Sequence, residues 1–307
     1  MNNPNRNRRE SVLVFGANGF LGSVVTKKLS HSGFDVLPVI RPGANKAKLQ
    51  NLSDMKLLEV ESDRWPGIVT EYAPDAVICA QWDGVLRQDR ENIDLQITNI
   101  EPILNIAIAT KVSGAGKFLC FGSQAEARES VETIGEEFYN SGESAYGIIK
   151  AKLHEHLASL FDDSDCRLIW ARVFSVYGPS DFSDSLFMRL FESQALGHEL
   201  VLLNPSKLWS FLYEDDFASA IEQILKNPTI KDTINIGSTR FHRIREIAAA
   251  WQGSTVVNLV DNQTSSTNLG LFPDVTKLKA IGWVPSISLE EGIKRTRKAF
   301  SDRINPR

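Results

Sequence analysis

The sequence predicts an α/β fold in which a doubly wound parallel sheet is followed by a smaller C-terminal α/β lobe. Between residues 11 and 172, short apolar runs rich in β-branched residues alternate with longer helical patterns, as repeated βαβ units require. Several of these runs are apolar at consecutive positions, which is typical of strands covered on both faces. After residues 176–181 the alternation fades into mixed helices and short strands.

Composition is that of an ordinary globular protein and argues against two classes of partner. The chain has 307 residues, of which 42% are hydrophobic and 23% charged, so it can bury a sizeable core. Its formal net charge of −4 disfavours non-specific binding to nucleic acid. No apolar run approaches the roughly 18 residues that suggest a membrane span. We therefore expect neither a nucleic-acid partner nor a membrane partner.

The first residues and the cysteines indicate a cytoplasmic protein without a metal site. Residues 1–10 are polar and basic and lack the apolar segment of a secretory signal, so we predict a disordered tail. Cys79, Cys120 and Cys166 are far apart and do not show metal-ligand spacing. Reduced thiols fit the cytoplasm, and we predict no bound metal.

Six apolar segments are predicted to form the parallel sheet in chain order. The first is followed by a helical pattern that ends at Gly33, because glycine is common just after the last helical turn. Similar helical patterns separate the later segments, as βαβ units require. The predicted strands are residues 11–16, 35–40, 55–60, 75–80, 117–122 and 166–173.

A glycine loop joins the first strand to the first helix and predicts a dinucleotide site. In "GANGFLG", Gly16, Gly19 and Gly22 allow a tight turn, close approach of backbone to pyrophosphate, and close packing of helix on strand. The helix N-terminus, where Phe20 and Leu21 lie, offers free N–H groups to the phosphates. Alone, the pattern also fits an ordinary glycine-rich turn. The strand before it and the helix after it favour the phosphate site.

The end of the second strand bears on the choice of cofactor. NAD-binding proteins of this type carry an acid about 20 residues beyond the glycine loop, whereas a nearby arginine suits the 2′-phosphate of NADP. Here Ile40 stands at the acidic position and Arg41 follows it. An exposed loop arginine is the alternative reading of Arg41. The missing acid and the added base together predict NADP (NADPH) in preference to NAD.

A serine, a tyrosine and a lysine form the predicted reactive group. Tyr146 and Lys150 are four residues apart on a predicted helix and share one face. A tyrosine hydroxyl becomes an acid–base at neutral pH when a nearby positive charge stabilises its phenolate. Ser123 lies at the carboxyl end of the fifth strand, where its hydroxyl can bind a substrate oxygen. A turn-forming Ser123 and a half-buried core Tyr146 are the alternatives.

With these motifs in order, the chain resembles an extended short-chain dehydrogenase/reductase of the NAD-dependent epimerase/dehydratase family. The resemblance covers nearly the whole chain. It implies a Rossmann domain, a small substrate lobe, hydride transfer at a sugar carbon, a nucleotide-linked sugar as the usual substrate and, by family analogy, a homodimer. The matching segments are "GANGFLG", "FGSQAE", "YGIIK", "ARVFSVYGP", "WSFLYEDDFASAI" and "LKAIGWVPSISLEEGI".

The domain boundaries and the remaining cofactor contacts follow this resemblance. We place the NAD(P)-binding Rossmann domain at residues 11–175. Residues 176–307 are predicted to be mainly a substrate-binding lobe, with some return to the Rossmann sheet. The predicted cofactor contacts beyond the glycine loop and Arg41 are Asp63, Ala80, Gln81, Asn99, Tyr146, Lys150 and Val173.

Departures from the family pattern around Ser123 narrow the reaction. Sugar dehydratases of the family follow this position with an Asp-Glu pair that serves elimination, but here Gln124 and Ala125 follow, and Glu126 is one position too far. GDP-fucose synthase carries a cysteine two residues on, where this chain has Ala125. Dehydration and that route of epimerisation are therefore disfavoured. A net ketone reduction, or a transient oxidation with return of the hydride to the other face, remains.

The predicted substrate lobe departs from the family as well. Trp209 replaces an arginine that meets the nucleotide phosphates in relatives, and Ser175 replaces an asparagine. A second phosphate-binding arginine is not visible in residues 260–272. Other cations would have to bind a diphosphate, for which Lys207, Arg240 and Arg243 are further candidates. The predicted substrate contacts are Ser123, Ser175, Arg189 and Trp209.

The reaction predicted first is an NADPH-dependent reduction of a 4-keto, often 6-deoxy, nucleotide sugar. Tyr146 would give the proton, Lys150 would hold the ribose and lower the tyrosine pKa, and Ser123 would orient the carbonyl oxygen. The alternatives are an NAD-retaining nucleotide-sugar 4-epimerase, a reductase of a non-nucleotide ketone or aldehyde, and a non-catalytic dinucleotide-binding module. The complete group of three argues against the last.

Overall fold

The computed structural model describes residues 8–52, 55–130, 132–137, 142–181, 185–251, 257–260 and 270–304. The predicted tail falls partly inside this range. Residues 1–7 lie outside it, whereas residues 8–10 contact the sheet. The Glu10 carboxylate pairs with Lys117 Nζ at 2.5 Å, and Arg8 reaches Asp75 at 3.4 Å. The expected tail therefore does not extend through residue 10.

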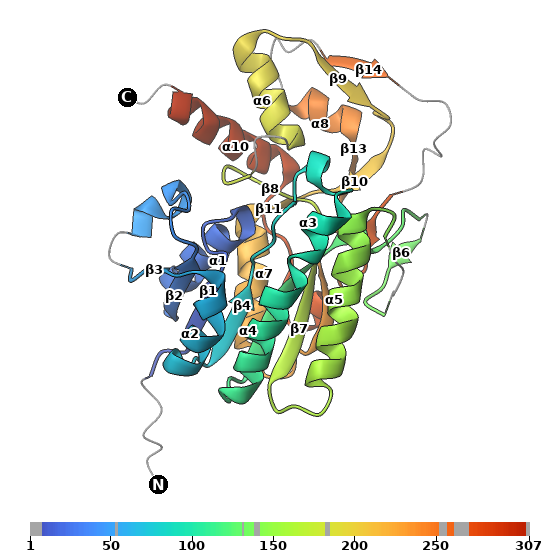
Figure 1. Ribbon diagram of the computed structural model, residues 1–307. Helices are drawn as coiled ribbons and strands as arrows, with labels where there is room; N and C mark the ends of the chain where they lie inside the picture. Colours follow the sequence, from blue (N-terminus) through green and yellow to red (C-terminus); the bar gives the residue numbers. More distant parts are fainter. Residues whose placement is uncertain are drawn as a thin grey trace.

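A seven-stranded parallel sheet forms the centre of the molecule and confirms the predicted fold class (Figure 1). Its strand order is β12-β7-β5-β4-β1-β2-β3. The six predicted strands all belong to it, although the third is shorter than residues 55–60. The strands are β1 (Ser11–Phe15), β2 (Asp35–Ile40), β3 (Leu58–Glu59), β4 (Ala76–Cys79), β5 (Lys117–Ser123), β7 (Arg167–Val173) and β12 (Asp232–Ile236).

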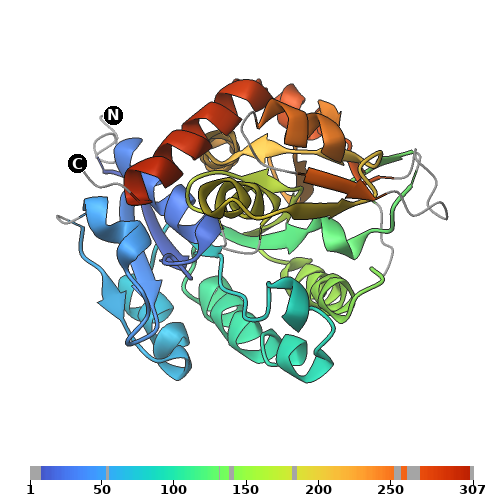
Figure 2. The ribbon, with the colours of Figure 1, turned by 90° about the horizontal axis from the view of Figure 1, so that it is seen from above.

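Helices cover both faces of this sheet (Figure 2). Alternate strand residues point to opposite sides, so the sheet contributes to two cores. On one side α1 (Phe20–His31) and α7 (Glu214–Lys226) pack on Val12 and Val14. The helices of the other side are α2 (Trp65–Tyr72), α4 (Ile100–Val112) and α5 (Ala145–Phe161).

A smaller lobe lies beyond the carboxyl edge of the sheet, at the top of Figure 1. Its own core is rich in aromatic side chains, such as Tyr177, Phe187 and Trp251. Its helices are α6 (Leu186–Leu196), α8 (Ile244–Ala250) and α10 (Leu289–Ile304). Its strands pair in twos: β9 (Leu200–Leu203) with β14 (Val257–Val260), and β10 (Leu208–Ser210) with β13 (Phe241–Arg243).

The chain after residue 176 serves both the lobe and the sheet. Strand β12 is an edge strand of the large sheet and pairs in parallel with β7. Helix α7 packs on α1, and α9 (Thr276–Ala280) supplies Leu278 to the same core. The remaining elements are short: η1 (Ala47–Leu52), η2 (Ser62–Arg64), η3 (Arg87–Asp89), α3 (Ile93–Ile97), η4 (Gln124–Glu126), β6 (Thr133–Ile134), β8 (Val176–Tyr177), β11 (Leu212–Tyr213) and β15 (Phe272–Pro273).

Two further observations concern segments and side chains outside the site. Among the described residues, no helix has both the length and the apolar character that crossing a bilayer requires. Cys79, Cys120 and Cys166 are all buried free thiols. The first two face each other on adjacent strands, at paired positions of β4 and β5.

Candidate active site

The glycine loop has the close contacts that a pyrophosphate-binding turn needs. Gly16 has a φ of +75°, and a Cβ there would lie 2.7 Å from the Gln81 backbone. A Cβ on Gly22 would lie 2.2 Å from the Gly16 carbonyl oxygen. Helix α1 begins directly after Gly19 without an acidic residue in its first turn and without a side-chain cap. The loop is thus tightly fitted, and its helix N-terminus suits an anion.

Arg41 is paired with a carboxylate from another strand end. It follows β2, and its guanidinium donates two hydrogen bonds to Asp83, at 2.8 and 2.7 Å. The two side chains are 51% and 40% exposed. The hydrogen bonds to Asp83 raise the pKa of Arg41 above its ordinary value. Arg41, the residue predicted to bind the 2′-phosphate, is therefore already paired with an acid in this structure.

The remaining predicted cofactor residues lie on four separate segments of the chain. Ala80 and Gln81 follow β4 beside the glycine loop, and the buried Asn99 accepts a hydrogen bond from the Asp83 N–H at 2.7 Å. Asn99 therefore holds the loop after β4. Val173 ends β7 opposite Ser123. Asp63 is exposed in η2, which follows the carboxyl end of the edge strand β3.

The reactive group is assembled where β5 ends and α5 begins. The Ser123 hydroxyl oxygen accepts a hydrogen bond from the Ala125 N–H at 3.1 Å. Helix α5 approaches this turn closely, because a Cβ on Gly147 would lie 1.9 Å from the Ala125 carbonyl oxygen. Tyr146 is 8% exposed, and the buried Lys150 donates to the Phe121 carbonyl at 2.6 Å. The fold thus gathers all three predicted residues at one turn.

Trp82 borders the reactive group and escaped the sequence analysis. Its ring lies edge-on to the Tyr146 ring, with centroids 5.8 Å apart, and Lys150 Nζ lies 3.7 Å from its centroid. The Trp82 indole N–H donates to the buried Gln96 at 2.8 Å, which fixes the ring. The signal was available, since Trp82 directly follows Gln81 at the carboxyl end of a parallel strand, where ligands bind.

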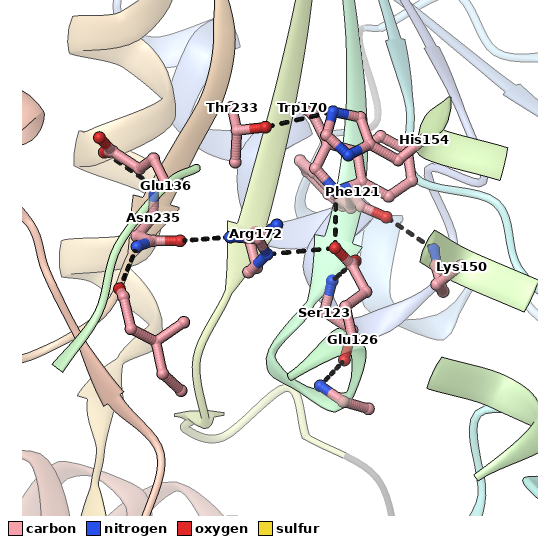
Figure 3. A network of polar contacts seen from close by, with 12 residues as sticks. Phe121, Ser123, Glu126, Glu136, Lys150, His154, Trp170, Arg172, Thr233 and Asn235 are labelled. Carbon is pink, nitrogen blue, oxygen red and sulfur yellow. Dashed lines mark hydrogen bonds and ion pairs between the residues drawn. The ribbon is translucent and has the colours of Figure 1, made fainter. Parts of the chain in front are cut away.

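Glu126 is the centre of a buried polar network beneath Ser123 (Figure 3). Its carboxylate accepts hydrogen bonds from the Ser123 backbone N–H at 2.6 Å, the Trp170 indole at 3.0 Å and Arg172 Nε at 3.1 Å. Arg172 also donates to Asn235 of β12 at 3.3 Å. Glu126 is 3% exposed, so its carboxylate is fully engaged in holding β5, β7 and the turn after β5 together.

His154 lies behind the same network and is held neutral. Its ring stacks on Trp170 with centroids 4.8 Å apart, and its Nε2 lies 3.1 Å from the Thr233 hydroxyl. Burial lowers the pKa of His154 to about 4. Through the described part of the chain, no group of three or more His, Cys, Asp or Glu side chains is placed to hold a metal ion.

Two of the four predicted substrate residues, Ser175 and Trp209, meet in an uncharged chain of hydrogen bonds. The Trp209 indole donates to the Ser175 hydroxyl, which donates to Gln124 Oε1 at 3.0 Å. Gln124, which was not among the predicted substrate contacts, thereby links the turn after Ser123 to the lobe. Lys207 lies 4.7 Å from the Trp209 ring centroid and pairs with Glu129.

Two other predictions for the substrate side concern separate parts of the chain. Arg189 lies on α6, half-buried in the smaller lobe. The prediction that a second phosphate-binding arginine is missing concerns residues 260–272, and residues 261–269 lie outside the described residues. That prediction is therefore not tested by the fold.

Comparisons with known proteins agree with this architecture. UDP-glucose 4-epimerase of Thermotoga maritima, in a crystal structure with UDP-glucose, superposes with a TM-score of 0.84 at 21% identity, covering 96% of this chain and 100% of that one. ADP-L-glycero-D-manno-heptose-6-epimerase of Brachyspira hyodysenteriae is 23% identical over 313 residues, which is 92% of this chain and 96% of that protein.

A plant relative matches over a shorter range. It is the trifunctional UDP-glucose 4,6-dehydratase/UDP-4-keto-6-deoxy-D-glucose 3,5-epimerase/UDP-4-keto-L-rhamnose-reductase of Arabidopsis thaliana, 28% identical over 142 residues. The match covers 44% of this chain and only 21% of that protein. The matched segment, which is less than half of this chain, thus spans about a fifth of the trifunctional enzyme.

The comparison with protein families matches most of this chain. The pattern of the family described as "NAD dependent epimerase/dehydratase family" matches residues 12–237, from the first strand to the end of β12. This range includes the glycine loop and the three residues of the reactive group. The chain therefore belongs to the NAD-dependent epimerase/dehydratase family and is an oxidoreductase of the extended short-chain dehydrogenase/reductase type.

Proposed function

We propose that the protein is an NADPH-dependent ketoreductase of a 4-keto, 6-deoxy nucleotide sugar. The observation that carries the proposal is the engagement of Glu126, whose carboxylate binds Ser123 N–H, Trp170 and Arg172. Elimination of water requires an acid and a base beside the ketone. With Gln124 and Ala125 in the positions of that pair and Glu126 buried, the turn after β5 supports hydride chemistry without elimination.

The glycine loop fits a dinucleotide, because Gly16 and Gly22 pack too closely on the Gln81 backbone and on the Gly16 carbonyl oxygen for a side chain, which makes the turn from β1 into α1 tight. The N-terminus of α1, which follows this turn, would offer N–H groups to the pyrophosphate. When bound, the reduced nicotinamide supplies the hydride that reaches the carbonyl carbon. Arg41 would bind the 2′-phosphate of NADPH once it turns from Asp83.

Ser123 and Tyr146 would act on the carbonyl oxygen. The oxygen of the Ser123 hydroxyl already accepts the Ala125 N–H, so its own proton is available to donate to the substrate. Tyr146 would transfer its phenolic proton to the developing alkoxide. The Lys150 ammonium, held at the Phe121 carbonyl, would stabilise the phenolate that remains.

The names of the relatives support the substrate class. The Thermotoga structure contains UDP-glucose, and the Arabidopsis protein includes a UDP-4-keto-L-rhamnose reductase in its name. A 4-keto nucleotide sugar carries the carbonyl group that a bound nicotinamide would reduce. Trp209, Ser175 and Gln124 would face the sugar-nucleotide with hydrogen-bonding groups in place of the family's charged contacts.

The test is a spectrophotometric assay of the purified protein. We expect NADPH oxidation with 4-keto-6-deoxy nucleotide sugars, and a single product reduced at the keto carbon by NMR. Failure to oxidise NADPH with any such sugar, together with interconversion of sugar epimers by bound NAD, would overturn the proposal. A matched reaction without sugar measures background oxidation.

The second candidate is an NAD-retaining nucleotide-sugar 4-epimerase, and the Arg41–Asp83 pair favours it. A guanidinium already neutralised by an acid attracts a 2′-phosphate less than a free one. For this function the purified protein would carry NAD that resists dialysis, and would convert sugar epimers without added cofactor. Free exchange of the cofactor would exclude it.

A homodimer is part of the proposal. Large apolar side chains are exposed on the helices of one face, where a partner would cover them. They are Ile93 and Ile97 of α3, and Ile108 and Val112 of α4. Light scattering of the purified protein would measure a mass of two chains, whereas the mass of one chain would remove this part of the proposal.

A further inference from the structure

We propose that Asp83 sets the preference between NADPH and NADH by controlling Arg41. This inference rests on the proposed placement of a dinucleotide at the glycine loop. Arg41 alone predicts a strong preference for NADPH. Asp83 weakens that preference, because its carboxylate competes with the 2′-phosphate for the same guanidinium.

The pair spans the strand that carries the glycine loop. In the sheet, β2 and β4 flank β1 on either side. Arg41 directly follows β2, Asp83 lies in the loop after β4, and Gly16 directly follows β1. Gly16 donates its N–H to Val39 of β2 and closely approaches Gln81 after β4. The ion pair therefore joins the two strand ends that border the loop.

Asp83 is the stationary member of the pair. Asn99 accepts the Asp83 N–H at 2.7 Å and donates to the Asp83 carbonyl oxygen at 3.1 Å. Asn99 is itself buried, with 1% of its surface exposed. The Arg41 side chain, in contrast, is long and half-exposed. When the pair opens, Arg41 turns away and the carboxylate of Asp83 stays beside the site.

The consequence differs for the two cofactors. A phosphate monoester carries about −1.5 to −2 charges near neutral pH, so the 2′-phosphate must draw Arg41 from Asp83 and then face a fixed carboxylate. A ribose with free hydroxyls needs an acceptor instead, and Ile40 cannot provide one. Asp83 can accept those hydrogen bonds without losing Arg41. It therefore opposes NADPH and assists NADH.

One more acid faces Arg41 and must be separated from Asp83 in the test. The Glu61 carboxylate also raises the pKa of Arg41, more weakly than Asp83 does. No hydrogen bond between Glu61 and Arg41 occurs among the residues that the structure describes. Glu61→Gln is therefore the matched control, since it removes one negative charge near Arg41 without removing a hydrogen bond.

The experiment measures the dissociation constants of NADPH and NADH by fluorescence titration, without sugar and without turnover. We expect Asp83→Asn to tighten NADPH about fivefold and to weaken NADH about twofold, in line with the strength of half-exposed ion pairs. Glu61→Gln should change both by less than about twofold. In an Arg41→Gln background, Asp83→Asn should tighten NADPH less than it does when Arg41 is present, because only the repulsion between the carboxylate and the 2′-phosphate is then removed. High salt should reduce the effect of Asp83→Asn when Arg41 is present.

Three outcomes would overturn the inference. Equal changes for NADPH and NADH would make Asp83 only a support of the loop. Weaker NADPH binding in Asp83→Asn would mean that Asp83 aims Arg41 at the phosphate. Binding of neither cofactor to the unaltered protein would refute the dinucleotide site and the proposed function together. Because turnover is not measured, the first two outcomes leave the proposed ketoreductase standing.

Discussion

Two arginine–carboxylate pairs lie at the carboxyl edge of the sheet and differ in their surroundings. The side chains of Arg172 and Glu126 are 2% and 4% exposed, whereas those of Arg41 and Asp83 are 51% and 40% exposed. A buried charge that loses its partner cannot turn to water, so the first pair holds its geometry. A half-exposed pair is worth little and can exchange partners. The reactive group thus rests on a fixed pair, and the cofactor side has an adjustable one.

The largest expected effect is on the chemistry above the buried pair. Tyr146→Phe removes the phenolic proton and keeps the ring that packs against Trp82. We expect turnover of the keto sugar to fall roughly a thousandfold, within the range for loss of a general acid, and NADPH binding to change far less. Tyr72→Phe is the control, because Tyr72 lies on α2 and its hydroxyl accepts a hydrogen bond from Lys56. Equal turnover in both variants would remove Tyr146 from the reaction.

The next effect tests the buried pair itself. Glu126→Ala removes the carboxylate that meets Arg172, Trp170 and Ser123 N–H. We expect the free energy of unfolding in urea to fall by about 3 kcal/mol, as is typical when one member of a buried pair is lost. Glu129→Ala, three residues along the chain and half-exposed, should lose less than about 1 kcal/mol. Similar losses in the two variants would contradict the contrast drawn between buried and exposed pairs.

The buried network also predicts a dependence of stability on pH. Burial lowers the pKa of His154 from 6.5 to about 4, so below pH 6.5 the unfolded chain binds a proton that the folded protein does not. The contribution of His154 is therefore present above the unfolded pKa and is lost as pH falls. Between about pH 7.5 and about pH 5 we expect a loss of about 2 kcal/mol.

The contribution of His154 is measured as a difference, because another buried group acts in the opposite direction. Burial raises the pKa of Glu214 to about 7, so the contribution of Glu214 to the stability of the folded protein falls as pH rises toward that value. Unfolding in urea at the two pH values is compared for the unaltered protein and His154→Gln, and the variant should be less sensitive to acid. His156→Gln, exposed on the same helix, should match the unaltered protein. A His154→Gln variant with unchanged acid sensitivity would refute the assignment.

The smallest expected effect belongs to the exposed pair. Asp83→Asn should change the free energy of unfolding by less than about 1 kcal/mol, because Asn99 still binds the backbone of residue 83 and the lost pair is half-exposed. Urea unfolding measures this change. A loss as large as that of Glu126→Ala would show that Arg41 and Asp83 are structural and not adjustable.

Local patterns predicted the parts of the site that a short segment encodes. Gly16, Gly19 and Gly22 follow a strand within one loop, and Tyr146 and Lys150 lie on one helix, so spacing alone placed them. The fold class followed from the same local alternation of strands and helices. These features need no knowledge of which strands are neighbours.

The remaining parts depend on contacts between distant segments. Asp83 lies 42 residues from Arg41, and the two meet because β4 and β2 flank β1. Gln124 meets Ser175 from a position 51 residues away. Spacing in the sequence gives no register between strands, so these pairs were not predicted.

Strand β12 contributes to the polar network beneath Ser123, although it comes late in the chain. Asn235, which binds Arg172, belongs to a strand that begins at residue 232, well after the last of the three reactive residues. During synthesis on the ribosome, β7 would have an unpaired edge until that strand emerges, and exposed strand edges favour association with other chains. A fragment that ends at residue 175 should therefore aggregate. If the chain is divided into two fragments that complement each other, the break should fall after β12.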